Sequence, residues 1–139
     1  MNRAEPYLRW LPPLVWATLI LIFSGQVGGS STTSVVLQTL LPAGISPETF
    51  DLIHLLVRKS GHLLAYGLLG VLNVRALQGQ ALLAITLAAA VSILDEWHQS
   101  YVPLRTGTPI DVVIDVAGAA LAVAAWCQFA RKAPPAASN

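Results

Sequence analysis

The separation of apolar from charged residues along this chain most constrains its fold. Charged residues make up only 11% of the 139 positions, against about 25% in ordinary soluble domains. They are nearly absent from four long apolar stretches, which cover 8–23, 61–77, 81–94 and 112–129. A backbone in lipid must satisfy its hydrogen bonds internally, so such stretches are expected to be helices. We therefore predict an all-α fold, a four-helix transmembrane bundle.

The longest connection between these stretches, residues 24–60, carries the signal for a further helix. Ser46, Pro47 and Glu48 offer an N-cap, a proline suited to the first helical turn and an early acidic residue. Apolar residues then recur at helical spacing, at Phe50, Ile53, Leu56 and Val57. We predict an amphipathic helix lying on the outer membrane surface between spans one and two. The alternative is a lid packed on the bundle.

Basic residues determine the predicted orientation, because lysine and arginine accumulate in cytoplasmic loops. If both termini are cytoplasmic, the basic residues on the inner side are Arg3, Arg9, Arg75, Arg131 and Lys132. Those on the outer side are Arg58, Lys59 and Arg105, all within or beside a polar cluster. We therefore predict a multi-pass protein with both termini in the cytoplasm. A cleaved signal peptide is the alternative for the first stretch.

The length suits a single domain, which we place at residues 1–132, and we predict a disordered tail at 133–139. The net charge of +1 gives no electrostatic case for nucleic-acid binding. The single cysteine excludes an intrachain disulfide. The sequence leaves the oligomeric state open.

Polar residues gather at helix ends that this topology brings to the outer side. Lys59, His62 and Tyr66 stand at i, i+3 and i+7, so they share one stripe of the second span. The third span ends in an acidic pair followed by a glutamine, and the fourth begins with two aspartates four positions apart. The candidate site residues are Gln26, Lys59, His62, Tyr66, Asp95, Glu96, Gln99, Arg105, Asp111 and Asp115. Ionisable groups at membrane depth are costly, which indicates a functional site.

These motifs resemble those of the VanZ-like family. Its lysine, histidine and tyrosine on the second span match Lys59, His62 and Tyr66, and its acidic pair with a glutamine matches 95–99. The other matching positions are Phe23-Ser24-Gly25-Gln26, Pro103, Arg105, Asp111 and Gly118. Position 115, often asparagine in that pattern, is an aspartate here. The resemblance implies a protein of the bacterial cytoplasmic membrane, some of whose relatives confer low-level resistance to teicoplanin. It implies no agreed reaction.

Three functions are compatible with the cluster. Lys59 and Arg105 could bind the anionic group of a membrane lipid or a lipid-linked cell-envelope precursor, since both side chains bind phosphate. Alternatively, the protein is an enzyme that acts on such a head group, with His62 as general acid or base. The best catalytic candidates would then be His62, Asp95, Glu96, Arg105 and Asp111. The third possibility is a purely structural network that fixes helix register.

A metal site is not expected from the sequence. His62, His98 and the nearby carboxylates could supply ligands, but no dense ligand motif such as H-E-x-x-H occurs and adjacent cations oppose a divalent ion. We expect no cofactor.

Overall fold

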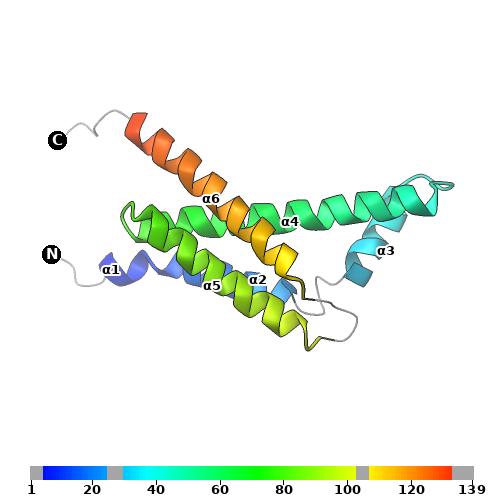
Figure 1. The fold of residues 1–139 in the computed structure, drawn as a ribbon, viewed down its shortest axis with the longest axis horizontal. Coiled ribbons are helices and arrows are strands. Elements are labelled where there is room, and N and C mark those ends of the chain that lie inside the picture. The colour runs from blue at the N-terminus through cyan, green and yellow to red at the C-terminus, as the bar shows by residue number, and fades with distance from the viewer. Residues whose placement is uncertain (1–4, 25–29, 103–106, 133–139) are drawn as a thin grey trace.

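The computed structural model describes residues 5–24, 30–102 and 107–132, and these form helices without strands (Figure 1). The helices are α1 (Glu5–Leu8), α2 (Leu11–Ile22), α3 (Ser30–Leu40), α4 (Pro47–Ala76), α5 (Ala81–Gln99) and α6 (Pro109–Lys132). The all-α prediction is confirmed. Two predicted site residues, Gln26 and Arg105, lie outside the described residues, as does the predicted tail.

Three of these helices, α4, α5 and α6, are long and apolar enough to cross a membrane. The shorter α2 is also apolar, and Pro12 and Pro13 lie in its first turn, where a missing backbone N–H is tolerated. These four helices correspond to the four predicted spans, so the predicted transmembrane bundle is confirmed.

Helix α4 joins two elements that the sequence analysis treated as separate. It begins where predicted, at the N-cap Ser46, whose hydroxyl accepts a hydrogen bond from the backbone N–H of Thr49 at 3.3 Å. It then continues for 30 residues without a break. The prediction of a distinct surface helix before the second span is therefore wrong. A charged residue such as Lys59 interrupts an apolar stretch but does not end a helix. The glycine that follows, Gly61, lowers the stability of the helix by only about 1 kcal/mol relative to alanine.

The separate helix between α2 and α4 is instead α3, in a part of the 24–60 connection for which no helix was predicted. Its first residues are serines and threonines, but Val35, Val36 and Leu37 follow, and Leu37 is buried. In Figure 1, α3 lies beside the N-terminal half of α4. It therefore covers the part of α4 that extends beyond the remaining bundle.

Helices α4 and α6 run in the same direction and pack closely against one another. A Cβ added to Gly118 would lie 2.5 Å from the carbonyl oxygen of Leu63, and one added to Gly70 would lie 3.0 Å from that of Ala119. Small residues permit this approach of two backbones. Further along the pair, the Arg75 guanidinium lies 5.3 Å from the ring centre of Trp126. Figure 1 places α1, the α4–α5 turn and the end of α6 at the same end of the bundle.

Candidate functional site

The site is built first from the facing stripes of α4 and α6. Lys59 forms an ion pair with Asp111, and one helical turn further along His62 Nδ1 lies 3.1 Å from Asp115 Oδ1. Both pairs follow from the same register, because residues three or four apart lie on the same helix face. The two stripes predicted from the sequence thus face one another.

Helix α5 adds an acidic pair and a bridging amide to this arrangement. The Tyr66 hydroxyl donates to Asp95 Oδ2 at 3.2 Å, and Gln99 Nε2 lies 3.2 Å from the same oxygen. Gln99 Nε2 also lies 2.6 Å from Ser24 Oγ and 3.4 Å from Glu96 Oε1. Since Ser24 lies two residues beyond the end of α2, the network joins all four predicted spans.

Two further contacts hold the carboxylates of α5 and α6. Ser92 Oγ donates to Asp115 Oδ2 at 2.7 Å, and the Thr108 backbone N–H donates to Glu96 Oε2 at 2.7 Å. The residue before Thr108 must be small, because a Cβ at Gly107 would lie 2.1 Å from the Glu96 carbonyl oxygen. The start of α6 therefore packs directly on the end of α5.

These polar groups are deeply buried. Asp95 and Asp115 are fully buried, and Glu96 is only 6% exposed. Burying a carboxylate is costly unless hydrogen bonds or opposite charges compensate for the lost water. Within the described part of the chain, Asp95 Oδ1 is buried without a hydrogen-bond partner. The network is therefore more than a set of surface ion pairs.

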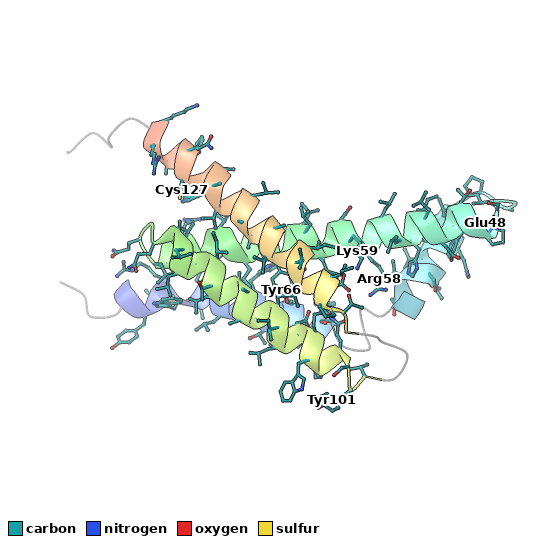
Figure 2. The ribbon with its side chains drawn as sticks, viewed as in Figure 1. Glu48, Arg58, Lys59, Tyr66, Tyr101 and Cys127 are labelled. Carbon is teal, nitrogen blue, oxygen red and sulfur yellow. The ribbon has the colours of Figure 1, made fainter. Side chains whose placement is uncertain are left out.

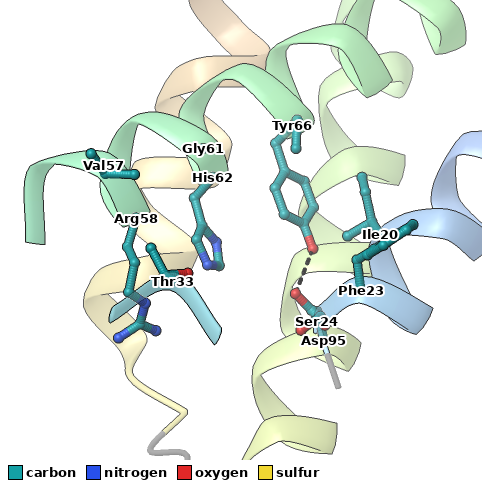
Figure 3. A pocket seen from close by; sticks show the side chains of 11 residues that line it. Ile20, Phe23, Ser24, Thr33, Val57, Arg58, Gly61, His62, Tyr66 and Asp95 are labelled. Atoms are coloured by element: carbon teal, nitrogen blue, oxygen red, sulfur yellow. Dashed lines mark hydrogen bonds between the residues drawn. The ribbon is translucent and has the colours of Figure 1, made fainter. Parts of the chain in front are cut away.

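A pocket of about 350 Å³ opens beside the network, between α2, α3, α4 and α5 (Figure 3). His62, Tyr66 and Asp95 supply polar groups from the network, and Arg58 supplies a cationic group. The apolar part of the lining includes Ile20, Phe23, Val57 and Ala65. The pocket can therefore take a ligand that has an anionic or polar end and an apolar remainder.

A family model described as VanZ/LLP1 matches residues 10–130, which is most of the chain. The chain belongs to the VanZ/LLP1 family. Comparisons with curated proteins and with solved structures give no match. Family membership and the apolar helices together identify a VanZ-like membrane protein.

In this VanZ/LLP1 chain, the structure gathers most of the predicted site residues into one network. Those that it describes and brings together are Lys59, His62, Tyr66, Asp95, Glu96, Gln99, Asp111 and Asp115. The positions of Gln26 and Arg105 lie outside the described residues. Whether any of these side chains binds a ligand stays a prediction.

Three residues that contribute to the network or the pocket were not among the predicted site residues. Arg58, considered only for the orientation of the protein, lines the pocket. Ser24, named only within the Phe23-Ser24-Gly25-Gln26 resemblance, accepts a hydrogen bond from Gln99 Nε2. Thr108 was missed, but Thr108-Pro109 followed by Asp111 is a helix-start signal that could have revealed it.

Proposed function

We propose that this VanZ/LLP1 protein binds the anionic head group of a cell-envelope lipid or lipid-linked precursor. The observation that carries the proposal is the mixed lining of the pocket. Arg58 and His62 lie on the same wall as Val57, and Ile20 and Phe23 lie opposite (Figure 3). Its volume lies at the lower end of the roughly 300–1,000 Å³ of small-molecule sites, which suits a head group better than a whole lipid.

Arg58 is the cation that we assign to the phosphate or carboxylate of this ligand. A guanidinium can bind two oxygens of such a group through parallel hydrogen bonds. Lys59, the neighbouring residue, is in an ion pair with Asp111. We therefore expect Lys59 to support the site through Asp111, while Arg58 contacts the ligand.

We further propose that the protein lies in the bacterial cytoplasmic membrane with both termini inside. The end of the bundle that holds α1, the α4–α5 turn and the end of α6 carries Arg9, Arg75, Arg131 and Lys132. Basic residues favour the cytoplasmic side. The pocket would then face outward, where cell-envelope precursors are used.

Native mass spectrometry of the full chain in mild detergent tests lipid binding. Wild type should retain a phospholipid or lipid-linked precursor, and Arg58→Gln should lose it. Arg131→Gln is the matched control, because Arg131 is exposed in the last turn of α6. Retention by Arg58→Gln at the wild-type level would refute the assigned role of Arg58, and no lipid on any variant would favour the structural network.

The second candidate is an enzyme that acts on the same head group. The observation favouring it is that His62 lines the pocket and that its Nδ1 lies 3.1 Å from Asp115 Oδ1. In many enzymes, a carboxylate at this distance orients the imidazole that acts as general acid or base. With a lipid found as above, His62→Asn should keep the lipid and abolish its turnover if His62 is catalytic. Unchanged turnover would remove His62 from the mechanism.

A contribution to glycopeptide resistance follows as a cellular proposal from the VanZ-like resemblance. Expression of wild type in a susceptible bacterium should raise the inhibitory concentration of teicoplanin, and Arg58→Gln at equal membrane abundance should not. If the inhibitory concentration were the same with and without the wild-type protein, the resistance proposal would be refuted while the lipid-binding proposal would still stand.

A further inference from the structure

We propose that His62, Glu96 and Asp115 hold a divalent first-row transition-metal ion where α4, α5 and α6 meet. One ligand atom from each of these side chains lies within 4.8 Å of the other two. The three residues come from three different helices. Tertiary packing therefore assembles the group, and a short sequence motif could not have predicted it. The inference concerns metal binding alone and does not depend on the lipid proposal.

The charge balance of the described residues favours a cation at this point. Within the described ranges, Lys59 is the one lysine or arginine ion-paired with the cluster, and its partner is Asp111. Asp95, Glu96 and Asp115 instead accept hydrogen bonds from His62 and from neutral groups. These three carboxylates are at most 6% exposed, so water compensates their charge less than it would at the surface, and a positive partner stabilises them more. A divalent ion would provide that charge.

Asp95 supplies a second, independent indication of a ligand. Its Oδ1 atom is buried and, in the described part of the chain, lacks a hydrogen-bond partner. Gln99 Nε2 contacts both Asp95 and Glu96, which keeps this carboxylate next to one of the three ligands. Figure 3 shows Asp95 and His62 pointing into the same pocket. A free carboxylate oxygen there can accept a hydrogen bond from a water bound to the ion, and the pocket gives the ion a route of entry.

Neighbouring groups already hold the proposed ligands in place. Ser92 Oγ donates to Asp115 at 2.7 Å, and the Thr108 N–H donates to Glu96 at 2.7 Å. Hydrogen bonds of this kind, from residues that do not touch the metal, orient the side chains that bind it. A set of one imidazole and two carboxylates suits Mn²⁺, Fe²⁺ or Zn²⁺ better than Mg²⁺ or Ca²⁺, which prefer oxygen alone.

Manganese titration of the full chain in detergent, after chelator treatment, tests the site by electron paramagnetic resonance. Wild type should bind one Mn²⁺ per chain, displaceable by Zn²⁺, and pulsed spectra should show nitrogen coupling from an imidazole. Glu96→Gln and Asp115→Asn should each weaken binding at least about tenfold. Asp51→Asn is the matched control, because Asp51 is exposed on α4, and it should bind as wild type does.

The histidine variants identify the nitrogen ligand. His62→Asn should lose the nitrogen coupling, whereas His98→Asn should keep it, because His98 is exposed on α5. Absence of stoichiometric Mn²⁺ or Zn²⁺ binding by wild type would overturn the proposal. So would bound Mn²⁺ without nitrogen coupling, or a coupling that survives in His62→Asn. If a carboxylate variant fails to fold, the wild-type spectrum alone decides whether the metal site exists. Metal binding without lipid binding would support this proposal alone, and lipid binding without metal binding would support the proposed function alone.

Discussion

The Lys59–Asp111 ion pair is asymmetric, since the lysine side chain is 30% exposed and the aspartate only 5%. Removing the lysine leaves a buried carboxylate without its cation, so Lys59→Met should lower the free energy of unfolding by about 1–3 kcal/mol, between the values for surface and buried pairs. Denaturant titration in detergent measures this loss. Adding Asp111→Asn should restore most of the lost stability, because no charge is then left unpaired.

The exposed Lys132 at the end of α6 provides the comparison for this experiment. Lys132→Met should leave the free energy of unfolding within about 0.5 kcal/mol of wild type. Equal stability of the Lys59→Met and Lys132→Met variants would show that the ion pair contributes nothing measurable.

Tyr66 is a second residue whose contribution can be isolated. It is 1% exposed, and its hydroxyl donates to Asp95. Tyr66→Phe keeps the ring but leaves Asp95 with fewer donors, so the free energy of unfolding should fall by about 1–3 kcal/mol. Tyr101→Phe serves as the control, because Tyr101 is 73% exposed. Thermal unfolding of both variants in the same detergent makes the comparison, and equal midpoints would contradict the predicted role of the hydroxyl.

At the residue scale, helical spacing predicted which side chains share a stripe but not how they pair. Lys59 and His62 could be placed on one face of their helix, and Asp111 and Asp115 on one face of theirs. The pairing depends on the axial register of α4 against α6, which is fixed by the approach at Gly118 and Leu63. That approach is a long-range packing property, so the sequence pattern could not predict it.

At the element scale, the backbone contact between α4 and α6 makes a sharp prediction about glycine. Gly118→Ala should lower the free energy of unfolding by about 1–3 kcal/mol, because the added methyl would force the helices apart. Gly61→Ala is the opposite case, since a Cβ there meets nothing within 4 Å. This variant should be neutral or more stable by up to about 1 kcal/mol. Denaturant titration ranks the two variants, and equal stability would contradict the close crossing.

Helix positions were predicted better than helix boundaries. Apolar runs identified α2, α4, α5 and α6, because a membrane span needs a long stretch without charge. The same rule began the second span at residue 61, in the middle of α4, since it detects lipid exposure rather than helical backbone. It also missed α3, whose opening serines and threonines favour caps and turns locally. Packing against α4 compensates for that local preference.

At the scale of the whole molecule, the proposed orientation predicts which ends react from each side. Figure 2 shows Glu48 and Cys127 at opposite ends of the molecule. In a Cys127→Ser background, Glu48→Cys should react with a membrane-impermeant maleimide in intact cells. Arg131→Cys should react only after the membrane is opened. The reverse pattern would invert the topology, and reaction of both in intact cells would contradict an odd number of spans between the two sites.

The parallel contact of α4 and α6 has a consequence for how the protein is made. Synthesis proceeds from the N-terminus, so α4 reaches the membrane before Asp111 and Asp115 have been translated. Each aspartate would be costly to insert alone, but Lys59 and His62 are already in place to receive them. Helix α6 should therefore depend on α4 for its own insertion, whereas α4 can enter the membrane first. The two pairs that align the finished helices would also set the order in which those helices are assembled.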